Sequence, residues 1–143
     1  MSVTGAGGEL VVFRDRLEGI DWAALKIALA ADRFDNGRTP EQLRRSFENS
    51  HASCVARLAG DVVGTARVLS DGVCNAYLVD VWTRSDLRKR GIAREMIRLV
   101  CVGLPGQHVY LQTDEVAFYS NLGFKRQPTG MSRVVGKWLN HDD

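Results

Sequence analysis

The stretch from residue 75 to residue 112 constrains the fold more than any other, because it indicates a strand, a helix and a second strand. Residues 75–83 (NAYLVDVWT) form a long, largely apolar run that suits a buried strand. Residues 91–102 place apolar side chains at helical spacing opposite a polar face, which predicts an amphipathic helix on a sheet. HVYLQ at 108–112 indicates the next strand. A helical crossover of this kind lets its two strands lie parallel.

The remaining segments predict antiparallel neighbours for this crossover. We expect further strands at 9–14, 52–59, 62–69, 124–127 and 131–135, and helices at 22–34, 40–49 and 114–122. Thr39-Pro40-Glu41-Gln42 carries a capping residue, a proline at the first helical position and the glutamine of a capping box. The order predicts an α/β fold of the α+β type, with a mixed, mostly antiparallel central sheet and helices on both faces.

Length and composition point to one folded domain. The chain has 143 residues, of which 45% are hydrophobic and 25% charged, as in ordinary globular proteins. We expect residues 1–8 to form a flexible leader, 9–139 the domain and 140–143 a tail. The start has no signal-peptide pattern, and three cysteines make a disulfide framework unfavourable, so we predict a cytoplasmic protein that does not span a membrane.

Positive charge gathers in one segment, although the net charge of the chain is only +2. Between residues 84 and 98 six basic residues accompany two acidic ones, and the rest of the chain is slightly acidic. The cluster lies where the strand at 75–83 ends and a helix begins near Gly91. Free backbone N–H groups and the helix dipole favour an anion there, and a glycine lets it approach closely. This pattern predicts a pyrophosphate site, and a solvated helix face beside a tight turn is the alternative.

Two motifs in this region resemble the GNAT superfamily of N-acetyltransferases. RKRGIA at 88–93, after a strand that ends in VWT, is similar to its acyl-CoA-binding signature, with Arg88, Gly91 and Ala93 at the three defining positions. VAFYSNLGF at 116–124 resembles the family segment in which an aromatic-tyrosine pair is followed by Leu-Gly-Phe. The resemblance covers residues 52–136. It implies a GNAT-like acyl-CoA N-acyltransferase fold, acetyl-CoA as cosubstrate, and a small-molecule or peptide amine as acceptor.

The resemblance also implies roles for individual residues. Backbone groups at the end of the strand would pair with the pantetheine arm, and the following loop would wrap the pyrophosphate. The implied cofactor-binding residues are Val81, Trp82, Thr83, Arg88, Lys89, Arg90, Gly91, Ile92, Ala93 and Arg94. Tyr119 matches the tyrosine that, in many members, protonates the departing CoA thiolate, and a phenol is a chemically suitable acid for this step. A packed core tyrosine is the alternative.

The general base is less well defined by the sequence. Many family members place a glutamate where this chain has Gln112, which does not accept a proton usefully. Three candidates stay open, namely Asp80, Tyr77 and a water relay. Asp80 is the only ionisable acid in residues 76–83, and we expect burial to raise its pKa. Binding a cationic amine or capping a β-bulge are alternative roles for Asp80.

The acceptor site is indicated only in outline. The family resemblance implies that the first two helices, their connection and the C-terminal strands select the acceptor, which points here to residues 31–40 and 127–132. Within this region and on the neighbouring strand we expect Phe34, Asp35 and Tyr77 to contact the acceptor, with a solvated loop residue or helix cap as the alternative for Asp35.

His51, His108 and His141 have no Cys or His partner at ligand spacing, so we predict no metal. A catalytically silent acyl-CoA-binding module and, less favoured because of the low net charge, a polyanion or nucleic-acid binder are the rival functions. Homodimer formation is left open.

Overall fold

The computed structural model describes residues 2–5, 8–127 and 129–141, and its centre is a mixed sheet of six strands within these residues. The strands lie in chain order and are β1 (Ser2–Gly5), β2 (Gly8–Arg14), β3 (Ala52–Leu58), β4 (Asp61–Ser70), β5 (Asn75–Thr83) and β6 (His108–Tyr110). Neighbours are antiparallel except β5 and β6, which are parallel. The predicted fold class is confirmed.

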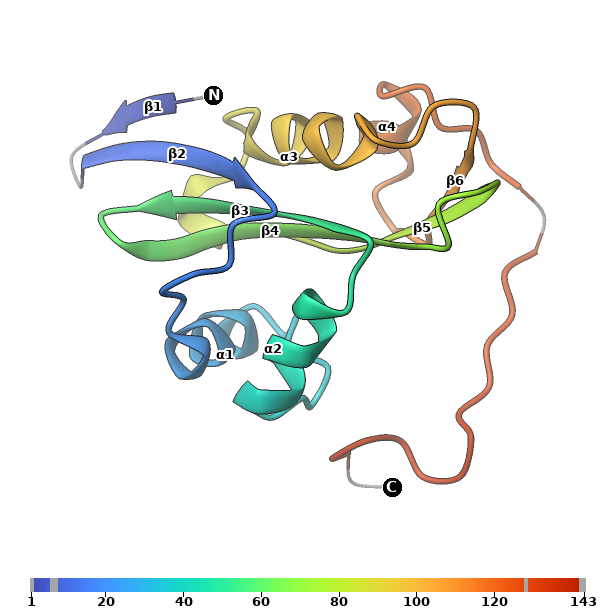
Figure 1. Ribbon diagram of the computed structural model, residues 1–143, viewed down its shortest axis with the longest axis horizontal. Helices are drawn as coiled ribbons and strands as arrows, with labels where there is room; N and C mark the ends of the chain where they lie inside the picture. The colour runs from blue at the N-terminus through green and yellow to red at the C-terminus, as the bar shows by residue number, and fades with distance from the viewer. Residues whose placement is uncertain (1, 6–7, 128, 142–143) are drawn as a thin grey trace.

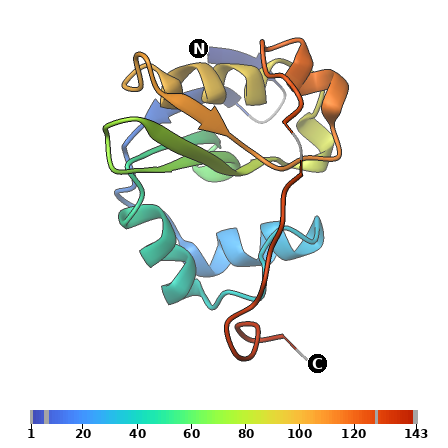
Figure 2. The ribbon, with the colours of Figure 1, turned by 90° about the vertical axis from the view of Figure 1, so that its right-hand side faces the viewer.

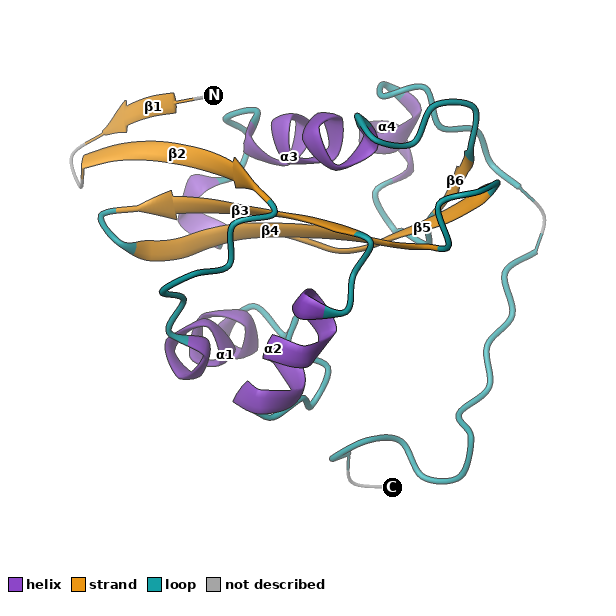
Figure 3. Ribbon diagram, viewed as in Figure 1, coloured by secondary structure: helices purple, strands orange, loops and turns teal. Residues whose placement is uncertain are grey.

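Helices cover both faces of this sheet (Figure 1, and by element type in Figure 3). Helices α1 (Trp22–Ala31) and α2 (Pro40–Glu48) lie on one face, while α3 (Ile92–Cys101) and α4 (Val116–Ser120) lie on the other. A short 3₁₀ turn, η1 (Ser85–Leu87), precedes α3. Each face has its own core: Met96 and Val100 of α3 pack with Ala66 and Val68 of β4, and Phe47 of α2 packs on the opposite face.

Helix α2 begins as the sequence predicts. The Thr39 hydroxyl accepts a hydrogen bond from the Gln42 backbone N–H at 3.2 Å, and the Gln42 side chain accepts one from the Thr39 N–H at 2.9 Å. This capping box satisfies two N–H groups that the helix leaves unpaired. Leu43 and Phe47, four residues apart, then face the core and are buried. The packing of this turn fixes the loop between α1 and α2 next to the sheet.

A β-bulge bends strand β5 at Asp80. Thr65 pairs with Trp82 and Arg67 with Val79, so Asp80 and the residue after it lie opposite a single residue of β4. Asp80 has φ of 53°, in the left-handed region that non-glycine residues seldom adopt. Its carbonyl accepts a hydrogen bond from the Thr65 hydroxyl at 2.8 Å. Pairing of β5 with β6 ends at Tyr77, before the bulge, so the second half of β5 turns away from β6.

The two ends of the chain differ from the sequence prediction. Residues 2–5 form strand β1 beside β2, where we expected a flexible leader. Residues 124–127 and 131–135 form no strand within the described part of the chain, and Met131 and Val135 are 90% and 83% exposed. β-branched residues favour strands through packing on a partner surface, and these residues have none there. The predicted C-terminal strands are therefore wrong.

The C-terminal segment instead runs across the molecule from the α4 layer to the α2 layer (Figure 2). Its end is held by Asn140, whose side-chain amide donates to the Gly37 carbonyl at 2.8 Å and to the Gln42 side-chain oxygen at 2.7 Å. The rings of Trp138 and His141 stack, with their centroids 3.5 Å apart. Among the described residues, no helix has the length and apolar character that a membrane span requires.

We expect Thr39→Ala to lower the free energy of unfolding by about 1 kcal/mol, because it removes the acceptor that caps α2. Denaturant unfolding followed by circular dichroism measures the change. Thr39→Ser keeps the hydroxyl and serves as the control, with stability close to the parent. Equal stability of the alanine and serine variants would contradict the role of the cap.

Candidate active site

A cleft of about 1070 Å³ opens where β5 and β6 separate. One wall is the second half of β5, and the other is the connection from β6 to α4 together with one side of α4. The floor is formed by the turn after β5 and the start of α3. The lining from these three parts comprises residues 77–83, 87–89, 91–94, 111–115, 118 and 119.

The start of α3 is shaped for an anion. Gly91 is the N-cap residue with φ of 81°, Lys89 has φ of 64°, and no side chain caps the helix. The backbone N–H of Glu95 is the donor of the bond to the Gly91 carbonyl, so the amides of the preceding residues point out of the helix into the loop. With the positive end of the helix dipole, these amides favour a phosphate. The residues present therefore fit the pyrophosphate of a CoA-type ligand.

Tyr119 lies on α4 in the wall of the cleft. Its ring is half-buried and makes edge contacts with Phe118 and Phe124, at centroid distances of 4.9 and 5.7 Å. Burial, with a smaller contribution from the charge of Glu115, raises the pKa of the Tyr119 phenol. The hydroxyl therefore carries its proton throughout the neutral range.

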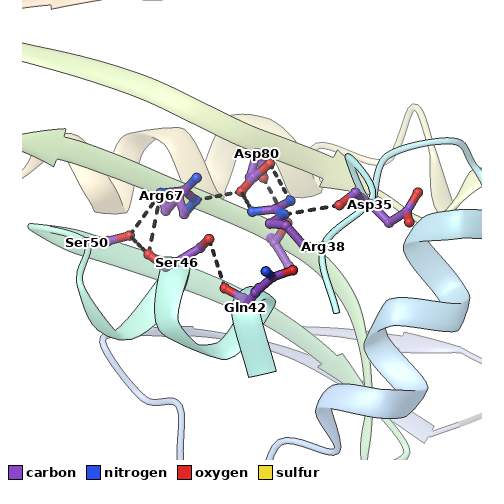
Figure 4. Close-up of polar contacts among 8 residues, drawn as sticks. Asp35, Arg38, Gln42, Ser46, Ser50, Arg67 and Asp80 are labelled. Carbon is purple, nitrogen blue, oxygen red and sulfur yellow. Dashed lines mark hydrogen bonds and ion pairs between the residues drawn. The ribbon is translucent and has the colours of Figure 1, made fainter. Parts of the chain in front are cut away.

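Asp80 is buried between two arginines (Figure 4). Arg38 binds both carboxylate oxygens, at 2.8 and 3.1 Å, and Arg67 donates through Nε to one of them at 2.5 Å. Burial alone would raise the pKa of Asp80, but the hydrogen bonds and charges of Arg38 and Arg67 outweigh it and hold the pKa below its usual range. The expectation of a raised pKa is wrong, because both partners come from segments distant in sequence.

Comparison with known proteins places this site in a family. The family described as Acetyltransferase (GNAT) family matches residues 21–124. The chain belongs to the GNAT acetyltransferase family. The match includes the bulged strand, the start of α3 and Tyr119, which are the parts that form the cleft.

Individual relatives agree with this assignment. The chain is 32% identical over 119 residues to "Serotonin N-acetyltransferase 2, chloroplastic" of Oryza sativa subsp. japonica, which covers 77% of this chain and 59% of that protein. A candidate acetyltransferase of Deinococcus radiodurans R1 is 30% identical with a TM-score of 0.76, covering 87% of both chains. A GNAT family acetyltransferase of Streptococcus pneumoniae TIGR4 is 20% identical, with a TM-score of 0.72 over 90% of this chain and 99% of the other. The Streptococcus pneumoniae structure shows that this chain shares the GNAT fold.

Most of the residues predicted for the cofactor lie in the cleft of this GNAT chain. Nine of the ten line it, and Arg90 is exposed outside the lining. The Trp82 side chain is buried, and its indole N–H donates to Asp32 at 2.9 Å, so it serves the core. Arg88 donates to the Thr83 carbonyl at 3.2 Å and lies 3.8 Å from Asp32, which ties the turn to the end of β5.

The predicted acceptor residues are only partly brought together. Phe34 and Tyr77 line the cleft, as does Gln112. Asp35 lies outside the lining. Its carboxylate accepts a hydrogen bond from Lys26 at 2.5 Å, and this bond lowers the pKa of Asp35. Arg33 and Asn36, which line the cleft and flank Phe34 and Asp35, lie in the segment 31–40 that the sequence indicated, but they were not singled out. Sequence reasoning assigned no role to Arg38 or Arg67, for which no local pattern exists.

The described residues contain no group of three or more His, Cys, Asp or Glu side chains that could hold a metal ion. Cys54 is buried in the core, and burial raises the pKa of its thiol to about 12. A thiol of this kind is not a nucleophile at neutral pH. The cleft beside β5 is therefore the candidate active site.

We expect Asp80→Asn to lower the free energy of unfolding by about 3–5 kcal/mol at neutral pH, because it leaves two buried guanidinium groups without their counter-ion. The lowered pKa means that the ionised carboxylate stabilises the fold above its ordinary pKa of about 3.9, and that this contribution is lost as pH falls through the folded value. Denaturant unfolding at pH 7 and at pH 3 measures both effects. The difference between parent and variant should shrink at pH 3.

Asp86→Asn is the matched control for this change. Asp86 forms an exposed ion pair with Arg84, which solvent screens, so stability should change little at either pH. An Asp80→Asn protein as stable as the control variant would contradict the structural role of the buried pair.

Proposed function

We propose that this chain transfers an acetyl group from acetyl-CoA to a primary amine by direct attack in a ternary complex. The observation that carries the proposal is the uncapped, left-handed start of α3 at the floor of the cleft that the β5 bulge opens. The cleft therefore combines a candidate anion site with an exposed strand edge. The chain spans only 59% of the rice relative's length, so the activity is argued from the site.

The cofactor would lie along the second half of β5. Backbone groups of Val81 to Thr83 line the cleft where β6 no longer pairs, and they are available to an extended amide-bearing chain. The amides of Ile92 to Arg94 would hold the pyrophosphate, with Arg88 and Lys89 nearby as charged donors. Acetyl-CoA supplies the activated thioester. Together these contacts hold both reactants close to each other.

Tyr119 would act as the general acid. The half-buried side chain lines the cleft and, with a raised pKa, stays protonated at neutral pH. It therefore holds a proton that it can give to the departing sulfur, and such positioned proton transfers accelerate reactions by about 10²–10⁴-fold.

The attacking amine must also lose a proton. Both oxygens of Asp80 are engaged by arginines and its pKa is lowered, which makes it a weak base. Tyr77, 37% exposed on the cleft wall, and a water relay are then the favoured routes. An acceptor that enters as the neutral amine needs only a weak base, because its proton can pass to water in the open cleft.

The acceptor class follows from the lining near Phe34 and Tyr77. These two aromatic side chains favour a primary amine with a flat apolar body. The rice relative is named for serotonin, an amine of this kind, which makes serotonin a natural first compound in an amine screen. We also propose a cytoplasmic location, based on the odd number of cysteines, although the name of that relative places it in the chloroplast.

Calorimetric titration with acetyl-CoA at moderate salt tests the cofactor site. We expect micromolar binding by the parent and none by the double variant Gly91→Glu, Ala93→Glu, because two carboxylates would face the pyrophosphate. The control Ala23→Glu, Ala24→Glu adds the same charge on the exposed first turn of α1 and should bind as the parent does. Absence of binding by folded parent protein at millimolar acetyl-CoA would overturn the proposal and favour a polyanion binder.

Steady-state kinetics with an accepted amine test Tyr119. Tyr119→Phe should lower kcat at least tenfold and leave the affinity for acetyl-CoA nearly unchanged, because only the proton donor is lost. Tyr110→Phe, an exposed tyrosine on β6, is the control and should keep full turnover. Unchanged turnover in Tyr119→Phe would remove this residue from the mechanism. Acetyl-CoA binding without turnover on any amine would favour the silent module.

A further inference from the structure

A second, smaller depression lies on the α2 side of the sheet. It has a volume of about 300 Å³ and is formed by α2, β4, the loop before α2 and the C-terminal segment. Its lining residues are Arg38, Gln42, Arg45, Ser46, Asn49, Arg67, Leu69 and Leu139. None of them lines the cleft beside β5, so the depression is a separate site.

The floor of this depression carries an excess of positive charge. Arg38 and Arg67 are only 7% and 9% exposed, and both bind the one carboxylate of Asp80. Exposed Arg45 adds a third cation at the rim, and no carboxylate is among the lining residues. Buried charges are normally balanced, because an uncompensated one is costly. Two arginines on one aspartate leave a buried charge that a bound anion would balance.

The two buried guanidinium groups also have donors to spare (Figure 4). Arg67 Nη2 forms no hydrogen bond with any described residue, and Nη1 makes only long contacts, at 3.4 and 3.5 Å, with Ser46 and Ser50. Each terminal nitrogen of Arg38 donates one hydrogen bond and carries a second hydrogen. Arg67 Nη2 has no partner among the described residues and yet is not fully buried, so its hydrogens are accessible from the depression that Arg67 lines. Oxyanions are the ligands that such donors bind best.

We propose that this depression binds a compact oxyanion, either a free phosphate-like ion or the same group carried on a small ester. Arg38 and Arg67 form the floor of the site, and Arg45 attracts the anion at the rim. A volume of about 300 Å³ accommodates one such group with water and is at the lower end for small-ligand pockets. Because Asp80 is the bulge residue of β5, a bound anion lies one side chain away from the cleft wall.

Calorimetric titration with inorganic phosphate tests this site. The start of α3 also favours phosphate, so the background is the Gly91→Glu, Ala93→Glu protein, in which two carboxylates block that loop. Sodium chloride at matched ionic strength is the salt control, and methyl phosphate is the ester probe. We expect saturable phosphate binding and a higher melting temperature than in chloride. Equal binding of methyl phosphate would identify an ester-carrying ligand, and binding of phosphate alone a free ion.

Arg67→Met is the decisive variant. It removes the surplus cation and leaves the two-bond pair of Arg38 with Asp80 intact, so the protein keeps a balanced buried charge. We expect phosphate affinity to fall by about tenfold or more, as loss of a charge-assisted hydrogen bond predicts. Arg44→Gln is the control, because it also removes one positive charge but at a residue of α2 outside the lining. This variant should bind phosphate as the background protein does.

Should Arg67→Met fail to fold, Arg45→Gln at the exposed rim serves instead, with an expected weakening of several-fold. No phosphate effect beyond chloride, or equal binding by the charge-removed and control variants, would overturn the proposal. The test uses neither acetyl-CoA nor an amine. Its failure is therefore distinguishable from failure of the acetyl-transfer proposal.

Discussion

Asp80 adopts a left-handed backbone conformation in β5, and its carboxylate is held by Arg67 of the neighbouring strand β4 and by Arg38 of the loop before α2. The extra residue turns the second half of β5 away from β6, so the parallel pairing stops at Tyr77. A regular strand would continue to pair and would close the sheet. The cleft, its exposed strand edge and the access to the start of α3 all depend on this local irregularity. An aspartate with a tight ionic clamp is one way to hold a strained residue in place.

Positive charge is held in two different ways in this protein. At the start of α3 the basic side chains are exposed, and the backbone amides with the helix dipole would provide the specific contacts to the proposed pyrophosphate. At Asp80 the guanidinium groups are buried and their geometry is fixed by one carboxylate. Exposed cations attract an anion over distance but are screened by salt, whereas buried ones act at contact. The two sites therefore suit a large polyanionic cofactor and a compact anion respectively.

The described part of the C-terminal segment links the layers without joining the sheet. It leaves α4 and ends at the loop before α2, where Asn140 binds Gly37 and Gln42 and Leu139 closes one side of the smaller depression. A Cβ on Gly37 would lie 2.8 Å from the His141 ring, so the close approach of this segment needs a glycine there. The loop that carries Phe34 and Arg38 is thus held by the capping box of α2 on one side and by the chain end on the other.

The sequence by itself determined the elements that depend on near neighbours. Helical spacing, the Thr39 capping box and the apolar run of β5 involve residues close along the chain, and their bounds agree with the structure to within a few residues. The motif at 88–93 indicated the proposed anion site for the same reason, because a strand end, a glycine and a helix start are local features.

Only the tertiary structure decided the ionisation of Asp80 and the path of the C-terminal segment. Arg38 lies 42 residues and Arg67 13 residues from Asp80. Arg67 meets Asp80 because β4 pairs with β5, and Arg38 reaches it from the loop before α2. Burial of a lone carboxylate predicts a raised pKa, and the sign reverses once other elements supply two cations. Strand propensity at 131–135 likewise had no effect without a neighbouring strand to pair with. Charge and pairing depend on what lies nearby in space, which neither composition nor periodicity specifies.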